Sequence, residues 1–376
     1  MQNARMTKDA GAKRMTSDGR HDETRGLQFP CGDPPAGGAV REILPGLLWL
    51  RMPLPFTLDH INVWAIADAD EAGPGWAIVD TGTQTPEALA AWRSLIAPNG
   101  PLAGTSQGAR LKRIFVTHMH PDHVGMAGWL ARKFNCRLWM SRVEYLTCRT
   151  LAADTGREAP EAAIRFYRQT GWPEEALDLY RARFGGFGRY MHTLPESYRR
   201  LIDGEVIRIG RHDWRVVVGR GHSPEHACLV CDDLQVMISG DQILPHISSN
   251  VSVFPTEPDA DPLGDWLDSI ARLRASLSDQ LLVLPAHGPP FRGVHQRLDR
   301  LAEGHEKGLA RLRERLSEPR RAIDVFGALF ARPIDDYELL LSLATGESLA
   351  HLNYLVARGE AVAELGGDGI RRYRLA

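Results

Sequence analysis

The sequence predicts an α+β fold in which two mixed sheets pack face to face with helices outside, an αββα sandwich. Two observations predict it. Strands, a helix, a strand and a helix follow one another in the first half of the chain, and the second half repeats that order. Polar turns that contain histidine or aspartate directly follow several of the apolar strands, as expected where strand ends meet at one rim.

The composition indicates a globular protein without a strong charge bias. The chain has 376 residues, of which 43% are hydrophobic and 24% charged, and its net charge is −2. There is therefore no basic field to attract nucleic acid or a membrane surface. No apolar run approaches the roughly 18 residues of a membrane span. The odd number of cysteines and the lack of a secretory signal predict free thiols in a cytoplasmic, reducing compartment.

Short apolar runs bounded by Gly, Pro or Asp define the first half of the main domain, which we expect to span residues 39–318. Strands are predicted at 41–52, 61–67, 75–82, 111–117 and 136–140, and helices at 85–97 and 123–134. Residues 1–38 have little to bury and end in a Pro/Gly-rich stretch, so we expect a flexible leader there.

The middle of the chain predicts a helical insert at about 141–202, broken by Gly and Pro, with a less clear helix at 195–201. The insert is rich in aromatic residues, and residues 141–200 contain ten arginines and eight acidic residues. One interpretation is an apolar lid over a site, with arginines that meet a phosphate-bearing carrier. The alternative is that the aromatic residues only pack the helices together and the charges lie on solvated faces.

Strands return in the second half, at 203–210, 214–219, 226–231, 234–240 and 281–288, with helices at 264–277 and 295–317. Residues 319–376 predict a small winged-helix-like module of short helices and a hairpin that turns at 366–368. Its seven Arg and Lys against eight Asp and Glu do not favour nucleic-acid binding. On the predicted helix at 351–360, His351 either reaches the mouth of a site or lies on the surface.

The stretch VTHMHPDHVG, residues 116–125, concentrates groups that can bind cations. His118 and His120 lie two apart at a strand end and can lean toward one ion. Asp122 and His123 begin the next helix and face a different direction, toward a second ion. Neutral imidazole is the commonest protein ligand for zinc-like ions. The turn alone would leave two ions short of ligands.

Three further candidates each follow an apolar strand: His222 in GRGHSPEH, Asp241 in MISGDQIL and His287 in LVLPAHGPP. Singly, each could be an ordinary loop residue. Together and in this order they complete a two-ion site at one rim of the sandwich.

These motifs, THMHPDH (117–123), GHS (221–223), SGD (239–241) and AHG (286–288), resemble those of the metallo-β-lactamase-fold hydrolases. The resemblance covers roughly residues 40–300 and is closest to the binuclear glyoxalase II, lactonase, thioesterase and nuclease side of that superfamily. It implies that His118, His120 and His222 hold one metal ion. It implies that Asp122, His123 and His287 hold the other and that Asp241 bridges them, with Asp122 and Asp241 as catalytic residues.

Supporting residues are also predicted. Asp80, in VDTG, matches a family feature and is expected to hydrogen-bond the far nitrogen of a ligand histidine, or else simply to end its strand. His226 is a candidate for similar support rather than a ligand, or a polar residue at its strand's start. Cys228 and Cys231 form C-x-x-C, but residues three apart on a strand face opposite ways, so we expect two buried thiols.

The implied chemistry is hydrolysis by a hydroxide that bridges two divalent metal ions, zinc with manganese or iron as alternatives. We expect a small acyl substrate joined by a carboxylic ester-like bond, a thioester or lactone, such as an acyl-CoA or glutathione thioester. The bridging aspartate argues against β-lactamase activity. Alternatives are a phosphodiesterase or ribonuclease of the same fold, a non-catalytic nucleic-acid-binding protein with a relic site, and a mononuclear iron dioxygenase. The sequence leaves the oligomeric state open, a homodimer included.

Overall fold

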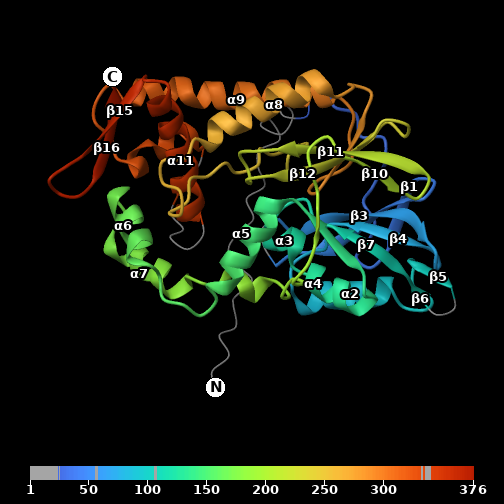
Figure 1. Ribbon diagram of the computed structural model, residues 1–376. Coiled ribbons are helices and arrows are strands. Elements are labelled where there is room, and N and C mark those ends of the chain that lie inside the picture. The colour runs from blue at the N-terminus through green and yellow to red at the C-terminus, as the bar shows by residue number, and fades with distance from the viewer. Residues whose placement is uncertain (1–23, 25, 56–57, 106–107, 332, 335–339) are drawn as a thin grey trace.

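Two mixed sheets lie face to face between helices, as predicted (Figure 1). The computed structural model describes residues 24, 26–55, 58–105, 108–331, 333–334 and 340–376. Figure 1 shows α2 and α4 below the first sheet and α8 and α9 above the second. The predicted αββα architecture is therefore confirmed.

The first sheet has the strand order β1-β2-β3-β4-β7-β8-β9. Its strands are β1 (Val40–Leu44), β2 (Leu47–Pro53), β3 (His60–Asp70), β4 (Gly73–Val79), β7 (Leu111–Phe115), β8 (Arg137–Met140) and β9 (Arg199–Arg200). The predicted single strand at 41–52 is wrong, because Pro45 and Gly46 turn the chain into a β1–β2 hairpin with Gly46 at φ 80°. The helix predicted at 195–201 is also wrong, since β9 pairs in parallel with β8.

The second sheet has the order β10-β11-β12-β13-β14. Its strands are β10 (Val206–Ile209), β11 (His212–Gly219), β12 (His226–Cys231), β13 (Val236–Gly240) and β14 (Leu282–Pro285). The first four run antiparallel, whereas β13 and β14 are parallel. Trp49 and Trp64 of the first sheet and Trp214 of the second belong to the apolar core between the two sheets.

Helices cover the two outer faces and bury one apolar side each. They are α2 (Pro86–Leu95), α3 (Pro121–Val124) and α4 (Ala127–Phe134) on the first sheet, and α8 (Pro262–Ser276) and α9 (Val294–Arg315) on the second. A minor hairpin, β5 (Ala103–Thr105) with β6 (Gly108–Ala109), follows α2. None of the helices in the described residues is long and apolar enough to cross a membrane.

The helical insert consists of α5 (Arg142–Ala153), α6 (Glu161–Gln169), α7 (Glu174–Arg183) and the short η1 (Phe187–Tyr190). Tyr145 of α5 packs into the core beneath the first sheet. Tyr167 of α6 stacks on Trp172 at 4.2 Å between ring centroids, and Trp172 Nε1 donates to Thr345 Oγ1 at 2.9 Å in the C-terminal part of the chain. These aromatic residues therefore pack against one another and against the C-terminal part, and the role of the insert as a lid stays a prediction.

The C-terminal part contains η2 (Ala322–Val325), α10 (Phe326–Leu329), α11 (Leu340–Ala357) and the predicted hairpin of β15 (Ala361–Leu365) and β16 (Arg371–Leu375). Its likeness to a winged helix stays a prediction. His351 is only 3% exposed, so both positions expected for it, the surface and the mouth of a site, are wrong. The reason is that α11 is enclosed on most sides and its His351 packs against His305 of α9.

The predicted leader lies partly outside the described residues. In its described portion, Gln28 N donates to Arg292 O at 3.2 Å and Arg292 N donates to Gln28 O at 2.9 Å. The Phe29 ring stacks on His246 at 5.5 Å. Residues 28 and 29 therefore contact the main domain.

The His305–His351 pair predicts acid sensitivity of the packing between α9 and α11. His351 Nδ1 donates to Glu347 O at 2.8 Å, so its Nε2 can accept from His305 Nδ1, 3.3 Å away. Burial lowers the pKa of His305 to about 3 and of His351 to about 4. The unfolded chain protonates both below about pH 6.5, but the folded protein does not. The free energy of unfolding therefore falls as the pH is lowered from about 6.5 toward 4. Each of the two histidines contributes a loss of up to about 1.4 kcal/mol per pH unit.

We expect the urea midpoint of the metal-free protein to fall between pH 7 and pH 5, and to fall less steeply in a His305→Gln variant. Tryptophan fluorescence in the presence of a chelator measures both. His212→Gln, at the partly exposed start of β11, is the matched control. If the urea midpoint fell equally with pH in the wild type and in His305→Gln, His305 would not be a source of the acid sensitivity.

Candidate metal centre

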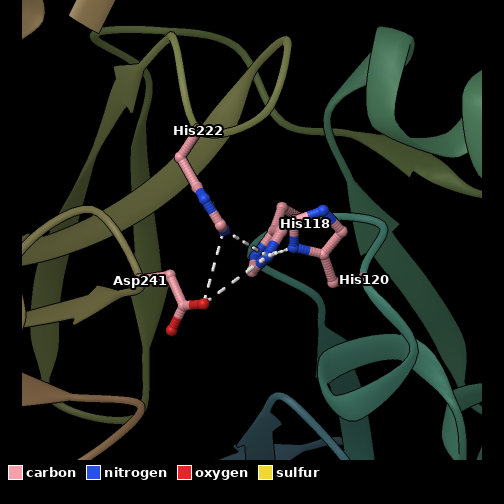
Figure 2. A group of neighbouring side chains, drawn as sticks. All are labelled: His118, His120, His222 and Asp241. Carbon is pink, nitrogen blue, oxygen red and sulfur yellow. Dashed lines mark hydrogen bonds and ion pairs between the residues drawn. The ribbon is translucent and has the colours of Figure 1, made fainter. Parts of the chain in front are cut away.

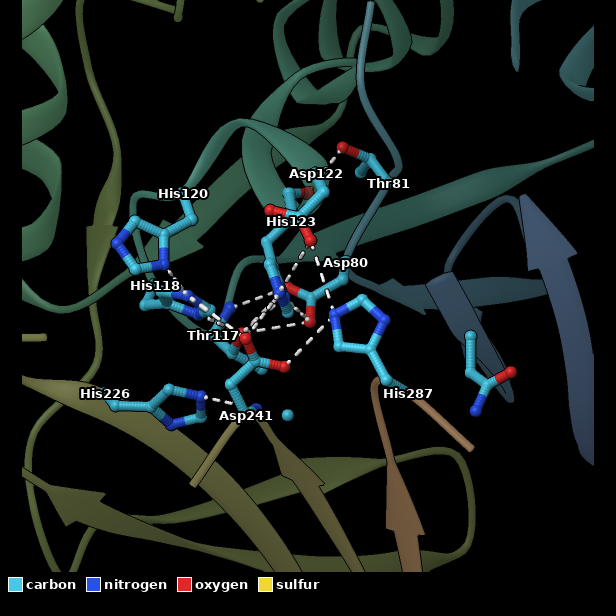
Figure 3. A network of polar contacts seen from close by, with 12 residues as sticks. Asp80, Thr81, Thr117, His118, His120, Asp122, His123, His226, Asp241 and His287 are labelled. Atoms are coloured by element: carbon cyan, nitrogen blue, oxygen red, sulfur yellow. Dashed lines mark hydrogen bonds and ion pairs between the residues drawn. The ribbon is translucent and has the colours of Figure 1, made fainter. Parts of the chain in front are cut away.

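All seven predicted ligands meet at one rim of the sandwich; Figure 2 shows His222 and Figure 3 the other six. The first group contains His118, His120, His222 and Asp241 (Figure 2), and the second contains Asp122, His123 and His287. Within each group the ligand atoms all lie within 4.8 Å of one another. Residues from both sheets thus form two adjoining sets of donors, each large enough to hold a cation.

The ends of four strands place these side chains. The turn after β7 carries His118 and His120, and Pro121 then starts α3, where its missing N–H costs no hydrogen bond. His222, Asp241 and His287 follow β11, β13 and β14. Gly240 takes φ 52°, and a Cβ there would lie 2.6 Å from the His226 ring. Only glycine fits at this turn, which directs Asp241 into the site.

Asp241 faces both groups. Its Oδ2 lies 3.4 Å from His222 Nε2 and 3.5 Å from His123 Nε2. Its Oδ1 lies 3.4 Å from His287 Nε2. One carboxylate therefore lies beside histidines of both groups.

Three of the histidines are oriented through their far nitrogens. His222 Nδ1 donates to Asn250 O at 2.7 Å, and His287 Nδ1 donates to His60 O at 2.8 Å. His123 Nδ1 lies 2.8 Å from Asp80 Oδ2. Such bonds fix the tautomer that leaves Nε2 available to a metal ion.

Asp80 and His226 lie beside the ligands. Asp80, at φ 61°, also accepts from the backbone N–H of Thr117 at 2.8 Å, and aspartate tolerates this left-handed conformation better than most residues. His226 Nε2 accepts from the Asp241 N–H at 3.0 Å, and its ring stacks 4.8 Å from that of His118. Both residues hydrogen-bond to candidate ligands, His123 for Asp80 and the backbone of Asp241 for His226, and belong to neither donor group.

The electrostatics of the first donor group favour the protonation states that bind metal. Burial among other imidazoles lowers the pKa of His118 well below its usual value and that of His120 to about 3. Burial opposes ionisation of Asp241, but His123 and His287 lower the pKa of Asp241 well below its usual value. Neutral imidazoles and ionised carboxylates are the forms that coordinate divalent ions. In the second group, Asp80 and the neighbouring carboxylates outweigh burial and raise the pKa of His123 well above its usual value, and Asp241 likewise raises the pKa of His287.

Two buried atoms at the centre show that the donor set fits a cation. Within the described residues, His123 Nε2 and Asp241 Oδ1 have no hydrogen-bond partner, although buried polar atoms normally have one. A mixed set of imidazole nitrogens and carboxylate oxygens suits zinc, manganese or iron.

Sequence reasoning missed two residues that brace this rim. Glu144 of α5 contacts the turns that carry His118, His120 and His222. Asn250, whose carbonyl oxygen orients His222, donates through Nδ2 to Glu347 Oε2 of α11 at 2.7 Å. Neither has a distinctive sequence signal, apart from the Ser141-x-x-Glu144 spacing that usually marks a helix cap.

The C-x-x-C pair is buried as predicted. Cys228 and Cys231 are both 0% exposed and carry free thiols. Cys228 belongs to the core beneath α8 and α9, and Cys231 to the core between the sheets, so the two face opposite ways.

Comparison with protein families confirms the predicted resemblance. Residues 56–287 match the family described as the metallo-beta-lactamase superfamily. Residues 309–376 match the family described as the metallo-beta-lactamase-like C-terminal domain. The second match begins inside α9, before the boundary predicted at 319.

Two solved structures are similar over nearly the whole chain. A beta-lactamase domain protein from Burkholderia ambifaria is 38% identical, with a TM-score of 0.85 over 94% of this chain and 100% of that one. A metallo-beta-lactamase family protein from Thermus thermophilus is 28% identical, with a TM-score of 0.72 over 89% of this chain and 100% of that one.

Curated relatives include fungal proteins. The atrochrysone carboxyl ACP thioesterase of Aspergillus fumigatus is 26% identical over 244 residues, 65% of this chain and 41% of that protein. Another, from Cryptosporiopsis sp., is 23% identical over 251 residues, 66% of this chain and 56% of that protein. The chain thus spans about half the length of these relatives.

Replacing Asp80 tests the support of His123. Asp80→Asn keeps the size and tolerates φ 61°, but it removes the charge that holds His123 Nδ1–H. We expect the affinity for a metal ion at the group with His123 to fall about 10- to 100-fold. Zinc titration against a competing chelator measures it, with Asp233→Asn, at an exposed turn, as control. Equal affinities in Asp80→Asn and the control would contradict the role.

Proposed function

This chain belongs to the metallo-beta-lactamase superfamily, and we propose that it is a binuclear metal-dependent hydrolase that cleaves thioesters. The observation that carries the proposal is the pair of donor groups that share Asp241. Two divalent ions in these groups would lower the pKa of a shared water and polarise the substrate carbonyl.

Each residue of the rim has a role in this proposal. His118, His120 and His222 would hold one ion, His123 and His287 would hold the other with Asp122, and Asp241, which faces both groups, would serve as a ligand shared between them. The Asp122 side chain is 20% exposed and lies 3.3 Å from His287 Nε2. It is therefore accessible to water and can accept a hydrogen bond from the attacking molecule, which fixes its direction of approach.

The substrate class is supported by the relatives and by the surface near the site. Relatives named as ACP thioesterases act on an acyl group attached to a carrier. On the loop that follows Asp241, Ile247 is 39% and Phe254 45% exposed, and we propose that these apolar side chains contact the acyl chain. We therefore propose an acyl thioester of a phosphopantetheine-type carrier or coenzyme A, with a lactone as the alternative. Zinc is the proposed metal, and the five free thiols support a cytoplasmic location.

The test combines metal content with thioester hydrolysis. The purified protein should contain two zinc-like ions per chain and release free thiol from octanoyl- and benzoyl-coenzyme A. Asp241→Asn should lower kcat/KM by at least about 100-fold, because an NH₂ group, which cannot bind a metal ion, replaces one carboxylate oxygen and the negative charge is lost. Asp233→Asn should retain wild-type activity.

Three other results would overturn the proposal. One iron per chain with dioxygen consumption would indicate an oxygenase. Turnover of a bis-phosphodiester but no thioester would indicate a nuclease. Binding of DNA or RNA in a mobility-shift assay without any hydrolysis would indicate a non-catalytic protein. Turnover of a lactone but of no thioester would still indicate a hydrolase, with a lactone as its substrate.

A further inference from the structure

A fully buried carboxylate joins the helical insert to the metal centre. Glu144, the third residue of α5, is 0% exposed. Its Oε2 accepts from the backbone N–H of Met119 at 3.0 Å, and Met119 lies between His118 and His120. Its Oε1 accepts from the backbone N–H of Glu225 at 2.7 Å, in the turn that begins with His222. One side chain thus binds both turns that carry the three histidines of the first donor group.

Two more bonds lock the same turn to the start of α5. Ser141 Oγ donates to Glu225 O at 2.8 Å, and Val143 N donates to Glu225 Oε2 at 3.0 Å. The Ser141-x-x-Glu144 spacing would normally cap the helix with its own side chains. Here Ser141 makes no capping bond, and both side chains reach across to other turns. Their use away from the helix end indicates that they serve the turn rather than the helix.

The chemistry of the contact requires a carboxylate. Glu144 receives one backbone donor on each oxygen, and these donors belong to turns about a hundred residues apart in sequence. A glutamine could accept only one of the two bonds and would direct its NH₂ group at the other N–H. A buried donor left without a partner costs about 1–3 kcal/mol.

We propose that Glu144 is a positioning residue that sets the spacing of His118, His120 and His222 and thereby the metal affinity of the first group. Glu225 is followed by His226, which holds the backbone of Asp241, so the clamp also reaches the shared ligand. The inference rests on the proposed two-ion site for its metal readout, but the clamp itself is testable without metal. The helical insert then has a defined role, because its first helix fixes the ligand geometry.

The experiment compares Glu144→Gln with Glu175→Gln, an exposed glutamate on α7 of the same insert. Hydrogen exchange of the metal-free protein should show at least about tenfold faster exchange in peptides that contain Met119 and Glu225, and unchanged exchange around His287. Cobalt titration against a chelator should show a loss of about 10- to 100-fold in affinity at the group with His118, and no change at the group with His287. Glu175→Gln should match the wild type in both.

If Glu144→Gln fails to fold, Ser141→Ala provides the test, because it removes one bond of the clamp without burying an amide. It should change exchange and affinity in the same direction, by several-fold. Wild-type exchange at both peptides, or equal loss at both metal groups, would overturn the proposal. If the wild-type protein binds fewer than two ions, the proposed function is refuted. The hydrogen-exchange result would still show whether Glu144 holds the two turns together.

Discussion

The structure depends on one constraint: a cluster of buried imidazoles and carboxylates persists only if every polar atom that faces away from the metal positions has a partner. Some of the partners come from the opposite sheet. His287, after a strand of the second sheet, is held by the carbonyl oxygen of His60 on β3 of the first. Asn62, also on β3, donates through its backbone to Ala286 O at 2.7 Å. The Ala227 N–H on β12 donates to Thr117 O at 2.8 Å, beside the histidine turn. The bonds that orient the site therefore also join the two sheets.

Two segments outside the sandwich extend this support. The insert reaches the rim through Glu144 at its start, and between α6 and α7 its Trp172 donates a hydrogen bond to Thr345 of α11. The C-terminal domain reaches the rim through Glu347 and Asn250. One apolar cluster includes residues of α6, α8, α9 and α11, so these parts share a continuous core. The site is consequently braced from three directions by segments distant in sequence.

Much of the architecture could be predicted from the sequence, because strand ends with clustered histidines are a local signal. His118 to His123 lie within six positions, and His222, Asp241 and His287 each follow an apolar run. The wrong predictions concern residues whose strand pairing or burial depends on segments distant in sequence. Two residues, Arg199 and Arg200, become a strand only because β8 lies beside them. His351 is buried because α11 is covered on most sides, which no periodicity reveals. Glu144 has the spacing of an ordinary helix cap, and only the fold shows that it serves another turn.

The link from Glu347 through Asn250 to His222 makes the orientation of one imidazole depend on the C-terminal domain. Without Glu347, the side-chain amide of Asn250 would lose its carboxylate partner, and the loop after β13 would hold the backbone carbonyl of Asn250 less firmly. The geometry of the first donor group therefore depends on both domains, so neither is a mere appendage of the other.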